Sequence, residues 1–272
     1  MERSGVQRLE RGDGHVAWEL EGHGPLVVFV PGMGDLRSSY RAIVPAIVAA
    51  GYRVVTMELR GHGDSSAAFS SYGDEATAGD IEALLEELAS AAVVVGNSMA
   101  AGAAVIVAAH RPELVTGLVL VGPFVRNPPL SWLTAIPFRV LMARPWAAKV
   151  WNAHYPRLNA GRRPADFEAY RHAITAAIGR PGYARAFSLT TRTNHSPAEV
   201  SLGRVQAPVL VVMGTLDPDF RKPAAEAAWI AGRTGAEVLM VPESGHYPQS
   251  QRPDLALPAI LAHLERSFRP GG

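Results

Sequence analysis

The 272-residue chain contains no cysteine. This absence excludes a disulfide framework, a thiolate zinc site and a cysteine nucleophile. Lysine is nearly as scarce, with 2 residues against 24 arginines, a ratio that indicates a base-composition bias in the coding sequence. The first 14 residues include charged side chains and lack the apolar segment of a secretory signal, so we expect a cytoplasmic protein.

Charge is missing from one long stretch of the chain. Between Leu88 and Ala109 no residue is charged over 22 positions, which is long enough to imitate a membrane span. Gly96, Asn97 and Ser98 interrupt the stretch, and the residues before them are β-branched while those after them are rich in alanine. The pattern therefore predicts a buried strand followed by a buried helix, and no membrane span.

The charges that are present are unevenly distributed. Net charge is only +1, but residues 124–204 hold twelve basic and three acidic side chains, a local charge of +9. The same segment has 10 of the 20 aromatic residues, and helical patterns broken by Pro and Gly but no convincing strand. We expect a helical cap here, inserted into a core formed by residues 1–123 and 205–272.

The rest of the chain alternates short apolar runs with helical patterns, after an early hairpin. Such alternation predicts an α/β fold with a mostly parallel, doubly wound sheet covered by helices on both faces. The expected strands are 26–30, 53–57, 91–95, 117–122, 207–214 and 237–241. The expected helices are 38–50, 77–88, 99–110, 224–231 and 253–268.

Ser98 lies where an expected strand gives way to an expected helix. A serine at the carboxyl end of a parallel strand sits in a sharp turn that tolerates only small neighbours, and Gly96 and Ala100 meet that demand. The following helix offers free N–H groups to a developing oxyanion. This position predicts a nucleophile.

A serine nucleophile needs a base, and the base needs an orienting group. Asp217 follows the expected strand that ends at Gly214, and His246 lies in the loop after the next strand. The order Ser, Asp, His along the chain, with each residue at a strand end, is the order of α/β-hydrolases.

Five short motifs occur in this same order. They read VPGMGD (30–35), LRGHGDSS (59–66), GNSMA (96–100), GTLD (214–217) and SGHYPQ (244–249). Together they resemble the α/β-hydrolase superfamily, and in particular its serine hydrolases with a lid, over practically the whole chain.

The resemblance implies a role for each matched residue. Ser98 would attack the carbonyl, His246 would take and return the proton, and Asp217 would fix the imidazole tautomer. The backbone N–H groups of Met33 and Met99 would form the oxyanion hole.

Substrate-binding residues are expected in the same loops and in the cap, whose aromatic side chains we divide between core packing and pocket lining. They are Gly32, Trp132, Trp151 and Tyr247.

Two matched positions allow other readings. Asp219 is an alternative acid, although the number of residues after Gly214 favours Asp217. His62 resembles a packing residue of this superfamily, so no chemical role is assigned to it.

No metal or cofactor is expected. Gly32-x-Gly34 after a strand, with Glu58 at the end of the next, imitates a dinucleotide fingerprint, but Arg37 occupies the third glycine position. The histidines of the expected cap have no carboxylate cluster at ligand spacing, namely His154, His172 and His195.

The expected reaction is hydrolysis of an ester, lactone or thioester through an acyl-serine, because haloalkane dehalogenases and epoxide hydrolases use a carboxylate nucleophile. GNSM also resembles the elbow of hydrolases that cleave carbon–carbon bonds in ring-fission products of aromatic degradation. Two features depart from that pattern: the pair Ala100-Ala101 stands where glycines are usual, and Tyr247 where a tryptophan is usual.

The partner is expected to be a small acyl substrate. The basic segment also suggests an anionic substrate or an acidic partner, against the simpler reading that its arginines are solvated. Nucleic acid is not indicated, no particular oligomeric state is suggested, and a non-catalytic ligand receptor on the same fold stays an alternative.

Overall fold

The computed structural model describes residues 5–127, 141–143 and 146–269. These residues contain an eight-stranded sheet with the order β1-β2-β4-β3-β5-β6-β7-β8. The hairpin of β1 and β2 joins the sheet antiparallel, and all later neighbours are parallel. The strands are β1 (Gln7–Arg11), β2 (Gly14–Glu21), β3 (Leu26–Val30), β4 (Arg53–Met57), β5 (Ala92–Asn97), β6 (Val115–Val121), β7 (Val209–Gly214) and β8 (Glu237–Val241).

Helices cover both faces of this sheet. One face packs against α2, α3, α8 and α9, and the other against α1 and α11. The helices of the core are α1 (Val44–Ala49), α2 (Asp74–Glu87), α3 (Met99–His110), α8 (Ser196–Ser201), α9 (Pro223–Thr234), α10 (Pro248–Gln251) and α11 (Pro253–Ser267). The predicted doubly wound α/β fold is therefore confirmed.

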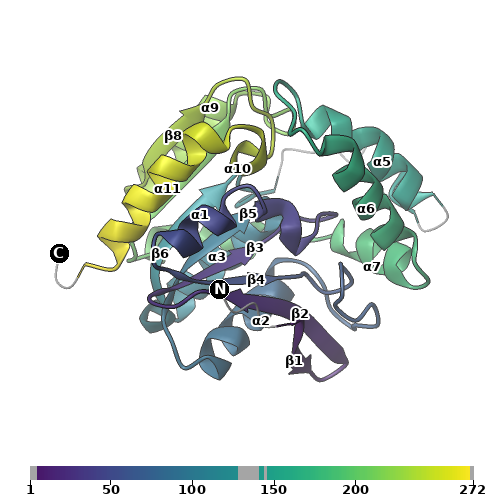
Figure 1. The fold of residues 1–272 in the computed structure, drawn as a ribbon, viewed down its shortest axis with the longest axis horizontal. Helices are drawn as coiled ribbons and strands as arrows, with labels where there is room; N and C mark the ends of the chain where they lie inside the picture. The colour runs from purple at the N-terminus through teal and green to yellow at the C-terminus, as the bar shows by residue number, and fades with distance from the viewer. Residues whose placement is uncertain (1–4, 128–140, 144–145, 270–272) are drawn as a thin grey trace.

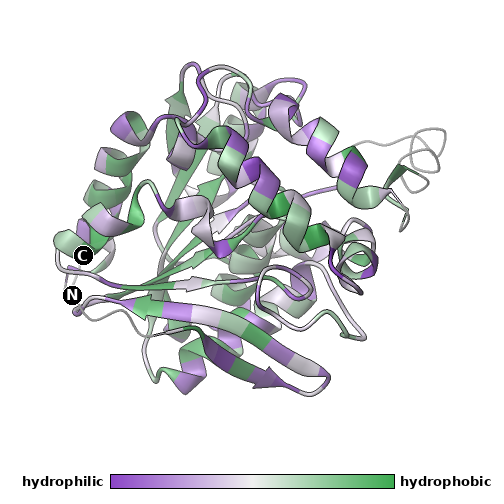
Figure 2. Cartoon of the chain, turned by 45° about the vertical axis from the view of Figure 1, so that its right-hand side comes forward, coloured by the Kyte–Doolittle hydropathy of each residue, from purple (hydrophilic) through white to green (hydrophobic). Residues whose placement is uncertain are grey.

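The central strands are buried on both sides because their side chains alternate between the two helical layers. In β3, Val28 and Val30 belong to one apolar cluster, whereas Val27 and Phe29 belong to the other. Figure 2 shows the resulting hydrophobic colour along the inner strands and mixed colour on the outer helices. Continuous apolar runs in the sequence thus mark the centre of the sheet.

The long uncharged stretch forms β5 and the buried helix α3, as predicted. No helix within the described residues is long and apolar enough to cross a membrane. The predicted helix 38–50 is shorter, since a 3₁₀ turn at Arg37–Tyr40 precedes α1. Pro45 explains the late start, because proline fits only the first turn of a helix.

Three helices between β6 and β7 form a layer of their own, which we call the cap: α5 (Ala147–Leu158), α6 (Phe167–Gly179) and α7 (Tyr183–Thr190). They lie together beside the sheet (Figure 1) and share a separate apolar cluster. By contrast, Ala198 in α8 and the nearby Leu202 pack into the core cluster. The domain limits 1–123, 124–204 and 205–272 stay a prediction.

Candidate active site

Ser98 occupies the one-residue turn between β5 and α3. Its backbone has φ 58° and ψ −123°, in the positive-φ region that costs a non-glycine residue conformational energy. A Cβ at Gly96 would lie 2.5 Å from the Ala100 carbonyl oxygen, so only glycine fits there. Tight backbone packing therefore explains why small residues flank the serine.

The loop after β3 lies directly against Ser98. A Cβ at Gly32 would come within 2.9 Å of the Ser98 Cβ. Within the described residues, neither the Ser98 hydroxyl nor the Met33 N–H has a hydrogen-bond partner. The Met99 N–H belongs to the first turn of α3, where N–H groups have no intrahelical acceptor. A hydroxyl and two unpaired N–H donors thus occupy one edge of the sheet.

His246 and Asp217 form a buried pair at the same edge. The imidazole Nδ1 is 2.8 Å from Asp217 Oδ2, and each residue is 2% exposed. The Asn97 amide donates to the His246 carbonyl at 3.3 Å, and a Cβ at Gly122 would lie 3.0 Å from the His246 Nδ1. The structure therefore holds the histidine loop against the strand end that precedes Ser98.

The environment of His246 favours its charged form. Burial opposes protonation, but the charge of Asp217 and its hydrogen bond outweigh it and raise the pKa of His246 to about 9. Asp219 adds to this effect, with its Oδ2 3.8 Å from Nδ1. The shorter contact makes Asp217 the orienting carboxylate of the two, in line with the spacing from Gly214.

His62 has a structural task that the sequence did not reveal. Its Nε2 accepts a hydrogen bond from the Gly34 N–H at 2.9 Å, and its Nδ1 is 2.9 Å from the Arg60 carbonyl oxygen. Burial lowers the pKa of His62 to about 4, so the ring is neutral and Nδ1 carries the proton. The histidine fixes the loop that carries Met33.

Two of the predicted substrate-binding aromatic residues lie beside this loop. Trp151 on α5 is buried, and its indole Nε1 donates to the Gly34 carbonyl oxygen at 2.8 Å. The Tyr247 ring is 2% exposed and packs edge-on against His246, 5.2 Å between centroids. Both side chains hold the walls of the site, and Trp132 lies outside the described residues.

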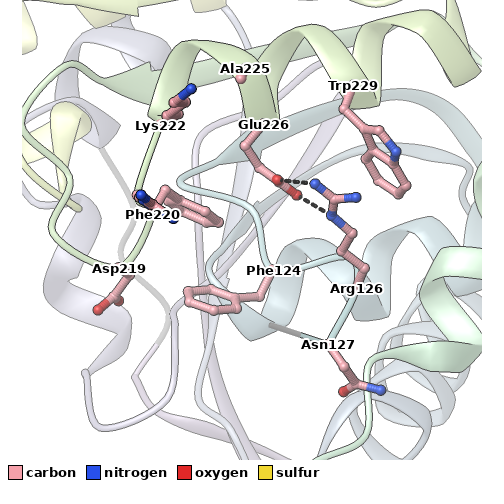
Figure 3. A pocket seen from close by; sticks show the side chains of 10 residues that line it. Phe124, Arg126, Asn127, Asp219, Phe220, Lys222, Ala225, Glu226 and Trp229 are labelled. Carbon is pink, nitrogen blue, oxygen red and sulfur yellow. Dashed lines mark hydrogen bonds and ion pairs between the residues drawn. The ribbon is translucent and has the colours of Figure 1, made fainter. Parts of the chain in front are cut away.

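A cavity of about 510 Å³ opens beside the histidine. The Phe124 ring lies 6.0 Å from the His246 ring and 5.0 Å from the Phe220 ring, centroid to centroid. Figure 3 shows the two phenylalanines facing each other. The lining residues are Phe124, Arg126, Asn127, Asp219, Phe220, Arg221, Lys222, Ala225, Glu226 and Trp229. Its floor is thus aromatic and close to the histidine.

The cationic side chains of this cavity differ in their partners. Arg126 binds Glu226 through Nε at 2.9 Å and stacks on the Trp229 ring at 3.9 Å (Figure 3). Arg221 and Lys222 are exposed, and their side chains have no ion pair or hydrogen bond with any described residue. The cavity is therefore lined by two cationic side chains that have no acidic partner among the described residues.

A second histidine–carboxylate pair flanks the same phenylalanine. His195 Nδ1 is 2.8 Å from Asp74 Oδ2 on α2, and its ring lies 5.6 Å from the Phe124 ring. The sequence suggested no carboxylate partner for His195, because the two residues are 121 positions apart. The pair joins the segment before α8 to the core.

One group of potential metal ligands occurs among the described residues. Its ligand atoms, from Asp217, Asp219 and His246, lie within 4.8 Å of one another. The Nδ1 atom in this group is hydrogen bonded to a carboxylate and so carries a proton, whereas a metal needs the lone pair. The donor set suits proton transfer better than metal binding.

The sequence profile described as the alpha/beta hydrolase family matches residues 27–258. The chain belongs to the α/β-hydrolase family. It is 26% identical to a probable esterase of Oryza sativa over 91% of this chain and 94% of that protein. It is 28% identical to the 2-(acetamidomethylene)succinate hydrolase of Mesorhizobium japonicum over 90% of each chain. This α/β-hydrolase thus aligns with both relatives over nearly their full lengths.

Solved structures share the fold of this α/β-hydrolase. A thermophilic esterase from Thermogutta terrifontis superposes with a TM-score of 0.82 at 23% identity, over 98% of this chain and 100% of that one. Est816, described as an N-acyl homoserine lactone degrading enzyme, superposes with a TM-score of 0.79 at 21% identity, over 94% and 99%. At these identities the likeness establishes the architecture.

Proposed function

We propose that this α/β-hydrolase is a serine hydrolase that cleaves a carboxylic ester, lactone or thioester of a small to medium, largely apolar substrate. The observation that carries the proposal is the buried His246–Asp217 pair, held at the strand end where Ser98 occupies a strained turn. Esterase and lactone-degrading activities in the names of similar proteins support the same reaction class.

Acylation begins with attack of Ser98 Oγ on the carbonyl carbon, while His246 Nε2 takes the hydroxyl proton. Asp217 accepts a hydrogen bond from Nδ1, which leaves Nε2 as the nitrogen that takes the proton. The oxyanion of the tetrahedral intermediate accepts hydrogen bonds from the N–H groups of Met33 and Met99. Collapse of the intermediate returns the proton from His246 to the leaving oxygen or sulfur and leaves an acyl-serine.

Deacylation uses the same groups. Water gives a proton to His246 and attacks the acyl carbon, and the second tetrahedral intermediate uses the same two N–H donors. Its collapse breaks the bond to Ser98 Oγ and returns the proton to the serine. Free acid and free enzyme result, and no cofactor takes part.

The proposal is tested by burst kinetics on p-nitrophenyl esters from acetate to octanoate. The intact protein should release about one equivalent of nitrophenol before steady turnover, and Ser98→Ala should lose the burst and about 10⁴–10⁶-fold of kcat. Ser90→Ala is the matched control, since within the described part of the chain its hydroxyl donates only to the Ala91 carbonyl oxygen, after α2. Turnover that survives in Ser98→Ala would overturn the nucleophile assignment.

A second candidate reaction is hydrolysis of a carbon–carbon bond in a vinylogous diketone carboxylate. The cations Arg221 and Lys222, which line the same cavity as Asp219, favour an anionic substrate, and one relative is named for a succinate derivative. Cleavage of such a diketone without turnover of any ester would replace the first reaction with this one. Ligand-induced stabilisation without turnover of either would indicate a receptor.

A further inference from the structure

The loop after β3 is held from two sides, and the two sides belong to different parts of the molecule. We call residues 32–35 the oxyanion loop, since it carries the Met33 N–H. On the core side, His62 accepts from the Gly34 N–H. On the cap side, side chains of α5 and α6 contact Gly34 and Asp35 of the loop. The orientation of each peptide group can therefore be traced to a named partner.

The Met33 N–H direction follows from a hydrogen bond inside the loop. The Asp35 N–H donates to the Gly32 carbonyl oxygen at 3.2 Å. The peptide between Gly32 and Met33 is planar and has no cis bond, so its N–H points opposite to its C=O. Whatever holds Asp35 and Gly34 in place thus fixes the direction of the oxyanion donor.

Trp151 of α5 holds Gly34. Its indole Nε1 donates to the Gly34 carbonyl oxygen at 2.8 Å, and the ring lies close against the backbone. A Cβ at Gly34 would lie 2.5 Å from the Trp151 ring, and the backbone φ of +72° also favours glycine. The contact needs both residues, a glycine in the loop and a tryptophan in the cap.

Tyr170 of α6 holds Asp35. The tyrosine hydroxyl donates to Asp35 Oδ1 at 2.5 Å, and this oxygen also accepts from the Leu36 N–H at 2.8 Å. The other oxygen, Oδ2, is buried without a partner among the described residues. Burying a carboxyl whose second oxygen has no hydrogen bond costs free energy, and the hydrogen bond from Tyr170 offsets part of this cost.

The cap end of this contact is itself fixed. Arg41 stacks on the Tyr170 ring at 3.8 Å, and its guanidinium binds both oxygens of Asp166, at the start of α6, at 2.6 and 2.7 Å. A bidentate pair of this kind sets orientation as well as distance. Tyr170 therefore reaches the loop from a helix end that is anchored to the core.

From these contacts we infer that Trp151 and Tyr170 are positioning residues for the oxyanion hole, through which the cap sets the direction of the Met33 N–H. The inference rests on the proposed function and adds a specific coupling to it. Because packing of the cap on the loop sets the donor that stabilises the tetrahedral intermediate, substrate contacts with the cap affect kcat as well as binding.

The test compares Trp151→Phe and Tyr170→Phe, which remove one donor each and keep an aromatic ring, with Tyr183→Phe. Tyr183 also joins the cap to the core, with its hydroxyl 2.9 Å from the Ser65 carbonyl oxygen, and it has no hydrogen bond to residues 32–35. Loss of a whole oxyanion donor costs about 10²–10³ in kcat, so loosening one should cost about 10-fold. We expect this loss in both test variants, with KM changed by less than about threefold, and no loss in Tyr183→Phe.

Two further readouts separate a positioning role from simple loss of stability. Affinity for an alkyl boronic acid, which forms a tetrahedral adduct on the serine, should fall in step with kcat/KM, whereas affinity for the acid product should not. Equal kcat in all three variants and the intact protein, or a rise in KM alone, would overturn the inference.

Amide hydrogen exchange keeps the inference testable if the proposed function fails. Exchange across residues 32–36 should be faster in Trp151→Phe and Tyr170→Phe than in the intact protein and in Tyr183→Phe. Faster exchange in a protein that turns over no acyl substrate would support the positioning role of Trp151 and Tyr170 and refute the proposed reaction. Unchanged exchange would refute the positioning role itself.

Discussion

At the residue scale, the reactivity of His246 depends on how many carboxylates face it. Asp217 contacts Nδ1 at 2.8 Å, and Asp219 lies about 1 Å further away, at 3.8 Å, and is partly exposed. Both charges stabilise the imidazolium, whereas a general base must be neutral before it takes a proton. In the proposed mechanism the pair of carboxylates would therefore orient the base and also restrict the pH range in which it acts.

This environment predicts the pH dependence of the reaction. Because the pKa of His246 is raised above its ordinary value of 6.5, its neutral form predominates only above that raised pKa. We expect kcat/KM to fall as pH is lowered through a midpoint well above 6.5. Removing one negative charge in Asp219→Asn should move the midpoint to lower pH and leave the plateau rate within about threefold.

The measurement is a kcat/KM profile from about pH 5 to 10 for the intact protein, Asp219→Asn and the control Asp254→Asn. Asp254 is an exposed carboxylate in the first turn of α11, paired with Arg252. A midpoint that stays in place or rises in Asp219→Asn would contradict the assignment of charge around the histidine.

The sequence predicted some residues of the candidate site and missed the contacts of others. Ser98, Asp217 and His246 follow strand ends and short motifs, so their meeting at one edge of the sheet could be expected. The contact between Tyr170 and Asp35 could not, since it joins residues 135 positions apart and depends on how α6 lies on the core. His62 was found in a motif, but its bond to the Gly34 N–H appears only in three dimensions.

At the scale of elements, the strands were predicted to within about two residues because burial on both faces leaves a continuous apolar run. Helix ends were less predictable. α2 begins at Asp74, three residues earlier than expected, where Thr193 from the segment after α7 donates to its carboxylate at 3.1 Å. Contacts that cap a helix from a distant part of the chain leave no local signal.

The same end of α2 carries a prediction on stability. His195→Ala removes the 2.8 Å contact with Asp74 and leaves a buried carboxyl with one partner fewer, so we expect a loss of about 2–3 kcal/mol in the free energy of unfolding. Urea titration measures it, with His172→Ala, an exposed cap histidine, as control. Equal midpoints for the two variants would show that the pair contributes nothing.

At the scale of the whole molecule, several of the positive charges expected in residues 124–204 are engaged in contacts. Arg126 binds Glu226, which lies outside the segment and offsets one charge. Arg171 binds Glu168 within the segment, and Arg180 donates to the Gly63 carbonyl oxygen, so these two contacts leave the net charge of the segment unchanged. Two cations whose side chains have no partner among the described residues, Arg221 and Lys222, belong instead to the loop after β7, on the core, and line the same cavity as Asp219. A charge count along the sequence located the region but not the side chains.

Substrate charge should therefore be sensed by Arg221 and Lys222. We expect Arg221→Ala/Lys222→Ala to lower kcat/KM for a p-nitrophenyl hemisuccinate about 3–10-fold, and to leave the neutral butyrate unchanged, because exposed pairs contribute about 0.2–1 kcal/mol each. The effect should shrink at high salt. Arg8→Ala on the edge strand is the control, and equal losses for both esters would contradict the idea.

The close contact between Trp151 and Gly34 links two sites that lie far apart in the gene. We expect a larger residue at position 34 to be accommodated only where the indole is replaced as well and the new residue tolerates a positive φ, as asparagine does. For protein engineers the consequence is practical. A chimera that exchanges the helices between β6 and β7 for those of a relative needs that relative's residues 32–36 in the same transfer.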